Sequence, residues 1–287
     1  MSSPDCPSTL PCALGKKVDL ANLSFSYLAG TDAERLGQCL WRVDHTSSGE
    51  SYFPEKYLSE WLHLQSMPSP IYCFEKVGVR PLAEAYSALV DSLQIDTVIL
   101  VDGGTDILMR GDEAGLGTPA EDMVSLAAVR SLDIQTKLVS CLGFGIDAFH
   151  GVCHAHFLEN VAALEQAGGY LGTHSLHLWM PEVSLFRNAV EFAHHRMPTQ
   201  QSIVNGSIVS ALEGHYGNHH RTDRTAGSEL FINPLMAMYW HFDLECVAQR
   251  SLYLELLRPT ESIFQVQLLI EAFRETTKAR PRRGIPV

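Results

Sequence analysis

Residues 98–123, VILVDGGTDILMRGDEAGLGTPAEDM, constrain the fold more than any other part of the chain. The run at 97–101 is β-branched and aliphatic without a polar face, which predicts a strand buried on both sides in a parallel sheet. Gly103 and Gly104 follow and let a ligand or another segment approach the backbone closely. The sequence TPAE at 118–121 matches a capping box with proline at the first helical position. We expect a strand, a long polar loop and a helix that ends near Ser131.

The predicted loop is strongly acidic. It carries one arginine, Arg110, and four carboxylates within twelve residues, at Asp102, Asp106, Asp112 and Glu113. Carboxylates this close repel one another unless a cation, shared protons or backbone donors compensate their charge. The carboxyl ends of strands are also the edge at which open α/β sheets bind ligands. We therefore interpret the loop as a ligand site. The alternative is a solvated loop whose aspartates cap turns.

The residue types predict separate roles within this site. A divalent metal is the cofactor that we expect, and carboxylates would hold it at Asp102, Asp106 and Asp112. The substrate would contact the glycines and the arginine of the same loop, at Gly103, Gly104 and Arg110. The general base would be Glu113 or a histidine near His150.

Two segments of the chain resemble a known family. DGGTDILMRGDEAGLGTP and the later HHRTDRTAGSELFINPLM are similar to the DUF1152 proteins, and the resemblance extends over most of the chain from about Lys16 onward. It implies a fold and a pocket but brings no agreed chemistry. Members of that family begin with an earlier strand and a glycine-rich loop that leads into a first helix. This sequence retains at most the end of that helix, and if its start is truncated, one wall of the pocket that the resemblance implies is missing.

The order of the elements predicts the fold class. Residues 97–101, 119–131, 136–142 and 157–166 read as strand, helix, strand and helix. This order is typical of a parallel sheet with right-handed crossovers. We expect an α/β fold with a mostly parallel sheet, helices on both faces in a Rossmann-like arrangement, and a helical C-terminal part. Both strand ends that carry glycines, at Gly103 and Gly143, should then open on the same edge.

Other segments carry weaker signals. We expect strands at 17–25 and 71–74 and helices at 52–64, 82–93, 181–195, 199–213 and 262–276. Residues 235–257 are apolar enough for a largely buried helix or helix pair. Two segments stay open: 33–43 is a short helix or a mixed segment, and 170–179 is a strand or a loop.

Length and composition bound the possibilities further. The 287 residues contain no internal repeat and no linker, which predicts a single α/β domain over 16–277 between a poorly ordered N-terminus (1–15) and a basic tail (278–287). The net charge of -12 argues against nucleic-acid binding, because the phosphate backbone requires clustered lysine and arginine. We expect no membrane span and no secretory signal. The seven cysteines, with no CxxC pair, are typical of reduced thiols and a cytoplasmic protein.

Histidines and arginines form a second group of candidates. His150 and His154 are four residues apart, a spacing that places both on one face if they share a helix, and His215 and His219 repeat it. The segment 214–228 is rich in glycine and predicts a loop. We assign its substrate-binding side chains to His219, His220, Arg221 and Arg224, because guanidinium groups bind carboxylate or phosphate. Alternatively, these arginines neutralise the acidic loop.

These observations predict an enzyme that acts on a small polar, anionic metabolite by metal-assisted hydrolase or lyase chemistry. GxGxxG, GxxxxGK[ST] and GxSxG are absent, so dinucleotide, P-loop and serine-hydrolase assignments lack their residues. One alternative is a noncatalytic sensor of a small molecule or nucleotide that uses the same pocket. Another is an assembly subunit, such as a homo-oligomer whose histidines and acidic loop lie at the interface.

Overall fold

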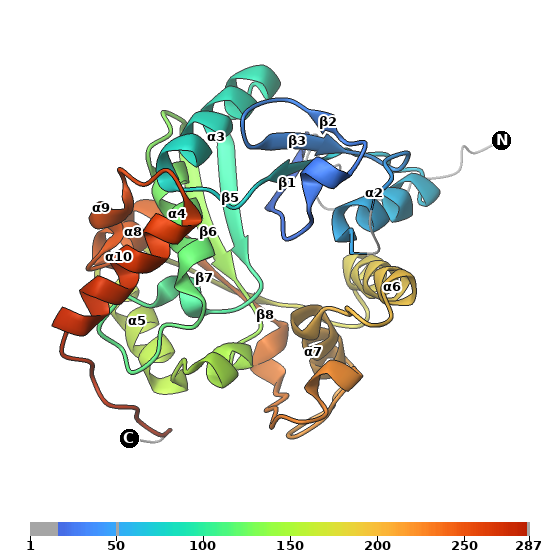
Figure 1. Cartoon of the computed structure of the whole chain (residues 1–287). Coiled ribbons are helices and arrows are strands. Elements are labelled where there is room, and N and C mark those ends of the chain that lie inside the picture. The colour runs from blue at the N-terminus through green and yellow to red at the C-terminus, as the bar shows by residue number, and fades with distance from the viewer. Residues whose placement is uncertain (1–16, 50–51, 286–287) are drawn as a thin grey trace.

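The protein has an α/β fold built on two four-stranded sheets (Figure 1). This computed structural model describes residues 17–49 and 52–285, so the predicted N-terminal segment 1–15 lies outside the described residues. The α/β class is confirmed. The expectation of a mostly parallel sheet is wrong, because both sheets are mixed, each with one parallel and two antiparallel pairings.

The first sheet comes from the N-terminal part of the chain. Its strand order is β1 (Leu20–Leu23), β4 (Ile71–Phe74), β3 (Leu40–Val43) and β2 (Glu34–Arg35). β1 runs parallel to β4, whereas β3 is antiparallel to β4 and to β2. The segment 33–43, which the sequence left open, therefore forms two strands. The helix expected at 52–64 is confirmed as α2 (Pro54–Leu64), which contacts β3 and β4.

The second sheet positions the acidic loop. Its order is β5 (Thr97–Asp102), β6 (Thr136–Cys141), β8 (Met238–Asp243) and β7 (Tyr170–Ser175). β5 and β6 are parallel, with Asp102 opposite Cys141, so both strand ends with glycines open on the same edge, as predicted. β8 is antiparallel to both of its neighbours, and this strand makes the sheet mixed.

The strand β8 replaces part of the helix expected at 235–257. Its sequence MYWHFD places Trp240 and Phe242 on one face and Tyr239 and His241 on the other. Phe242 is completely buried, and Trp240 packs against the main core. Side chains that face the core therefore recur at every second residue of this segment. Its high apolar content fits a buried helix equally well, which is why composition alone predicted the wrong element.

β5 is covered on one face only, contrary to the prediction of a strand buried on both sides. Val98 and Leu100 pack against the main core beneath α3 (Val79–Leu93) and α4 (Pro119–Arg130). Ile99 and Val101 point the other way and are 51% and 59% exposed. An aliphatic run without a polar face therefore does not by itself place a helix on each side of a strand.

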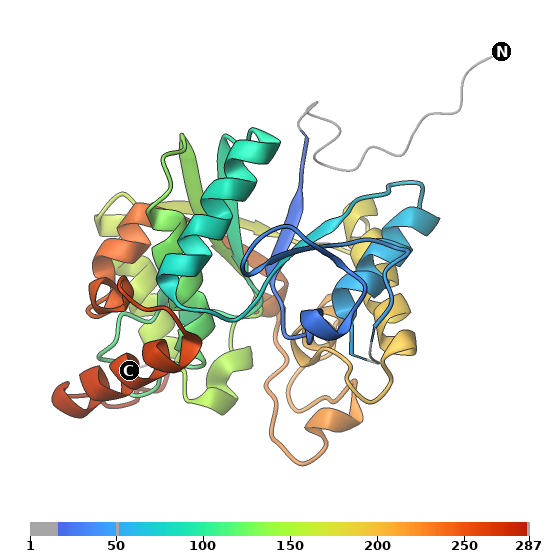
Figure 2. The same cartoon turned by 45° about the horizontal axis from the view of Figure 1, so that its top comes forward.

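The remaining helices surround these sheets. The C-terminal half contains α5 (His154–Gln166), α6 (Pro181–Arg196), α7 (Ile203–Leu212), α8 (Leu244–Arg250), α9 (Leu254–Leu257) and α10 (Ile263–Thr276). Figure 2 shows α3, α4 and the C-terminal helices with the second sheet on one side of the molecule, and the first sheet with α2 and α6 on the other. The larger hydrophobic core lies between α3, α4, α5, α8 and the second sheet. Among helices of the described residues, none has the length and apolar content that a membrane span needs.

Candidate metal site at the carboxyl end of β5

The ends of β5 and β6 approach each other closely. A Cβ atom added to Gly143 would lie 3.3 Å from the Gly103 carbonyl oxygen, and Gly143 has a φ of +80° that disfavours other residues. Gly104 is equally constrained, because an added Cβ would lie 2.7 Å from the carboxylate oxygens of Asp147. Glycine is therefore required where the two strand ends and their carboxylates meet.

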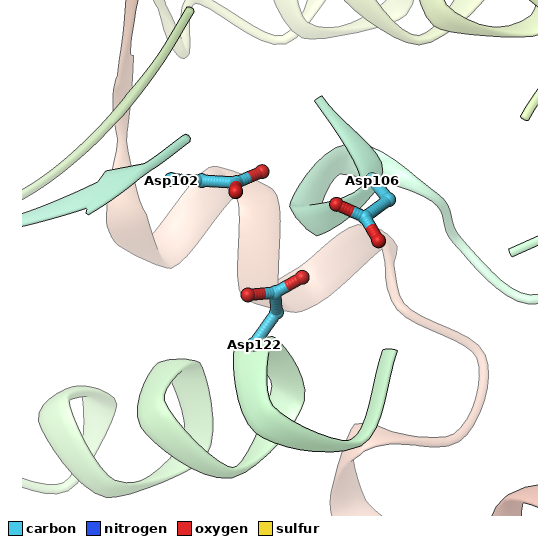
Figure 3. Close-up of side chains that lie close together, drawn as sticks. All are labelled: Asp102, Asp106 and Asp122. Carbon is cyan, nitrogen blue, oxygen red and sulfur yellow. The ribbon is translucent and has the colours of Figure 1, made fainter. Parts of the chain in front are cut away.

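Three aspartates converge at this edge (Figure 3). Asp102 ends β5, Asp106 begins the following 3-10 turn (Asp106–Leu108), and Asp122 lies in the first turn of α4. One carboxylate oxygen from each lies within 4.8 Å of the others. Asp106 is buried, whereas Asp102 and Asp122 are half-buried. The three side chains come from a strand, a turn and a helix that share one end of the sheet.

Backbone and hydroxyl donors hold two of these carboxylates in place. Asp102 Oδ1 accepts a hydrogen bond from the Gly104 N–H at 2.9 Å. Asp106 Oδ2 accepts one from the Thr118 N–H at 2.7 Å and another from the Thr118 hydroxyl at 3.2 Å. α4 starts at Pro119 as predicted, but Thr118 does not cap the helix with its side chain. The expected capping box is therefore wrong, because the hydroxyl of Thr118 contacts Asp106 instead.

A fourth aspartate, Asp147, lies in the turn Ile146–His150 after β6. Its Oδ2 accepts a hydrogen bond from the Thr105 N–H at 2.6 Å and contacts the Thr105 hydroxyl at 3.3 Å. These contacts join the loop after β6 to the loop after β5. Asp147 is thus fixed beside the three converging aspartates.

The four clustered carboxyl groups lack a lysine or arginine partner among the described residues. Burial, followed by repulsion from Asp106 and Asp147, raises the pKa of Asp102 well above its ordinary value. Burial and the neighbouring aspartates likewise raise the pKa of Asp122, and burial together with Asp106 raises the pKa of Asp147 to about 7. Within 17–49 and 52–285, no lysine or arginine forms an ion pair with any of the four. Such a group binds a cation or retains protons.

A protein-family model described as "Protein of unknown function (DUF1152)" matches residues 25–278. The chain belongs to this family. The resemblance seen in the acidic loop and in the later HHRTDR segment is therefore confirmed. No curated protein and no solved structure matched the chain.

Glu113 of this DUF1152 protein is enclosed by hydrogen-bond donors inside the fold. It is completely buried, and it accepts hydrogen bonds from the backbone N–H groups of Arg110 and Gly111 at 3.1 and 2.9 Å. The Asn160 side-chain amide donates a third bond at 2.9 Å. These donors fix the Glu113 carboxylate in place and occupy both of its oxygens.

Asp112 lies outside the cluster and has its own cationic partners. The Arg280 guanidinium contacts its carboxylate at 3.0 Å, and Arg110 contacts it at 3.4 Å. The Arg280 N–H also donates to the Asp112 carbonyl at 2.7 Å. This part of the predicted basic tail therefore packs against the second half of the acidic loop, where it compensates the charge.

The histidines are divided between different elements. His150 is exposed at the end of the turn after β6, whereas His154 is the first residue of α5, so the two do not share a helix face. The rings of His215 and His219 stack in a loop with centroids 3.7 Å apart. His220 Nδ1 lies 2.9 Å from the Thr225 hydroxyl.

The arginines of the same loop bond to groups on and beside α6 and α7. Arg221 forms ion pairs with Glu213 at 2.5 Å and with Glu191 at 3.5 Å. Arg224 donates a hydrogen bond to the Gln201 carbonyl at 2.7 Å. The structure thus brings Asp102 and Asp106 together beside Gly103 and Gly104, but shows no bond between either arginine and the acidic cluster.

Sequence reasoning missed Asp122 and Asp147. Asp122 directly follows the TPAE segment, and the first turn of a helix that starts at a strand end can face that end. Asp147 follows the glycines after β6 in the same way that Asp102 and Asp106 flank the glycines after β5. The repeated pattern of strand, glycines and aspartate in this DUF1152 chain is the signal that identifies the fourth carboxylate.

A separate polar group lies on the opposite face of the second sheet. The Ser140 hydroxyl lies 2.8 Å from His241 Nδ1, and His241 Nε2 lies 2.8 Å from His174 Nδ1. Ser140 precedes Cys141, the residue paired with Asp102, and adjacent strand positions point to opposite faces. This hydrogen-bonded chain therefore does not contribute to the aspartate cluster.

Proposed function

We propose that the protein is an enzyme that binds a divalent cation through Asp102, Asp106 and Asp122. The observation that supports this proposal is the convergence of three carboxylate oxygens within 4.8 Å, without an ion pair to any lysine or arginine of the described residues. A divalent cation would relieve their repulsion and would offset the cost of their burial. The sequence analysis expected Asp112 as the third ligand, and we propose Asp122 in its place.

The donor set selects a class of cation. Three carboxylates without cysteine or histidine favour a hard ion such as Mg²⁺, Mn²⁺ or Ca²⁺ over Zn²⁺. These ions take six or more oxygen ligands, so three aspartates leave positions for water or substrate. The bound ion would polarise a substrate oxygen or lower the pKa of a bound water.

The proposed substrate is a small anionic metabolite, and the proposed reaction is a hydrolase or lyase reaction. Three carboxylates and one divalent ion carry a net charge of about -1, so long-range attraction does not hold an anion here. An anionic oxygen would have to coordinate the ion directly. Gly103 is exposed beside the cluster and leaves room for such an approach. The contacts predicted for Gly104, Arg110 and the segment 219–224 stay predictions.

Asp147 is the proposed general base in place of Glu113 and His150. Thr105 donates to one of its carboxylate oxygens, which leaves the other available to accept a proton. A base has to lie within reach of the reacting group, and Thr105 fixes Asp147 beside the three carboxylates proposed to hold the ion.

A noncatalytic sensor is the second candidate. The observation that favours it is the position of the two expected bases, since Glu113 is fully bonded and His150 is exposed at the far end of its turn. Both candidates bind a ligand at the cluster, and only turnover separates them. For either, we propose the cytoplasm as the location, because the five cysteines within the described residues are free thiols.

Titration calorimetry with Mn²⁺ and Mg²⁺ tests the proposal, together with the metal content of the purified protein. We expect one site per chain and a loss of about 100-fold in affinity for Asp106→Asn and for Asp122→Asn, because each removes a charged ligand. Asp112→Asn is the matched control, since this carboxylate pairs with Arg280, and it should bind the ion as the wild type does. Equal affinity in all four proteins would overturn the proposed ligand set.

A further inference from the structure

A cavity of about 510 Å³ lies between α5, the segment 231–235 and the C-terminal residues 283–285. Its walls are mainly apolar and include Phe144, Leu158, Phe231, Leu235 and Ile285. This volume falls in the range of small-molecule sites, about 300 to 1,000 Å³. The C-terminal wall is fixed in place, because the Arg283 carbonyl accepts a hydrogen bond from the Cys153 thiol at 3.0 Å.

One polar atom in this cavity lacks a partner. His154 Nε2 is buried and forms no hydrogen bond, although His154 lines the cavity. The ring lies between two aromatic side chains, with centroid distances of 5.1 Å to Phe144 and 6.1 Å to Phe231. Gly145 packs beside this nitrogen, since a Cβ atom there would lie 2.7 Å from it. A buried nitrogen without a partner is costly, and a ligand that bonds to it recovers that cost.

Two arginines lie at the C-terminal wall of the cavity, although the whole chain carries a net charge of -12. Arg283 lines the cavity, and Arg282 is close enough to act electrostatically on His154. No ion pair involves either guanidinium group within the described part of the chain. Arg280, in contrast, is bound to Asp112 and Glu159. The two arginines nearest the cavity are therefore available to a ligand.

We propose that this cavity is a binding site for a small aromatic carboxylate. Aromatic edges favour an aromatic ring, His154 Nε2 offers one hydrogen bond, and Arg282 and Arg283 attract the carboxylate. Burial, assisted by Arg282, lowers the pKa of His154, so the ring is neutral at physiological pH and can donate from Nε2.

The site is distinct from the aspartate cluster but shares a loop with it. Phe144 and Asp147 are three residues apart, so their Cα atoms are separated by at most about 11 Å. Ligand binding here does not depend on a metal at the cluster. This proposal and the proposed enzyme function can therefore be tested independently of each other.

Calorimetric titration of the full chain with phenylacetate tests the inference, with phenylacetamide as the neutral probe and hexanoate as the aliphatic one. We expect saturable binding of phenylacetate, about tenfold weaker binding of the amide, and weaker binding of hexanoate. Chelator-treated protein should give the same result. Absence of saturable phenylacetate binding would overturn the proposal, and stronger binding of hexanoate would overturn the aromatic assignment.

Four variants locate the bound probe. Leu158→Trp fills the cavity from an α5 position that is 37% exposed, and it should abolish binding, whereas Leu252→Trp, at a 45% exposed position elsewhere, should not. His154→Phe keeps the ring and removes Nε2, and we expect about tenfold weaker binding. Arg282→Gln combined with Arg283→Gln should remove the preference for phenylacetate over its amide, while Lys278→Gln should keep it. Unchanged binding in Leu158→Trp would place the probe elsewhere and refute the site.

Discussion

The acidic cluster and the loop 214–228, called the arginine loop, both contain grouped charged residues, but the structure pairs their charges differently. Asp102, Asp106 and Asp122 face one another without an ion pair to any described lysine or arginine. Arg221 is neutralised by Glu213 and Glu191 on neighbouring helices. Charged side chains stay available to a ligand where the tertiary structure leaves them without an ion-pair partner. The comparison therefore favours the cluster as the binding site.

The largest expected effect is cation-dependent stability. A ligand that binds only the folded state stabilises it by about 2.7 kcal/mol at a concentration 100 times the dissociation constant. We expect Mn²⁺ to raise the urea midpoint of the wild type and of Glu213→Gln, but not that of Asp122→Asn. The measurement is urea denaturation followed by circular dichroism, with and without the ion. Equal stabilisation of Asp122→Asn by Mn²⁺ would contradict the assignment of the cation to the aspartate cluster.

The next effect is the pH dependence of the metal-free protein. The pKa of Asp147 is raised to about 7, so the folded protein favours the neutral form of this carboxyl group. The stability that the neutral form contributes is fully present below pH ~4, the ordinary pKa of aspartate, and is lost as pH rises through 7. Asp147→Asn should therefore be more stable than the wild type at pH 8, by roughly 2 kcal/mol, with a smaller difference at pH 5. Urea denaturation across this range checks the sign. A wild type that gains stability relative to the variant between pH 5 and pH 8 contradicts it.

The arginine loop should show the opposite sign and a smaller effect. Burial raises the pKa of Glu213, but hydrogen bonds and ion pairs with Arg221 and Arg187 outweigh it, and the net pKa is lowered. Its contribution is thus present above the ordinary value of 4.5 and is lost as pH falls. We expect Glu213→Gln to cost about 1 kcal/mol at pH 7 and nothing at pH 3. A cost that persists at pH 3 would show that the pairing does not cause it.

The smallest expected effect is that of His150→Ala. The imidazole is exposed, and the ring of the neighbouring Phe149 is its one aromatic contact among the described residues, so stability should change by less than about 0.5 kcal/mol. Cation affinity, measured by calorimetry, should also stay unchanged. A large loss of turnover in this variant, once a substrate is identified, would restore His150 as a general base and would weaken the role proposed for Asp147.

Much of the site was predictable because its signals are local. An aliphatic run followed by glycines and aspartates correctly indicated the end of β5, and the proline at position 119 indicated the start of α4. Both glycine-bearing strand ends open on one edge, as the order of elements required. The contribution of Asp122 was not predictable from the loop, because it depends on the angle at which α4 returns over β5.

The sequence by itself determined the family, the α/β class and the loop that carries Asp102 and Asp106, because local periodicity and turn chemistry act between neighbouring residues. Tertiary structure decided that β8 enters the sheet antiparallel to β6, that Asp122 and Asp147 join the cluster, and that Glu213 neutralises Arg221. These outcomes depend on contacts between residues distant in the chain. Pairing and burial in three dimensions, rather than residue type, determine which charges remain free to bind a ligand.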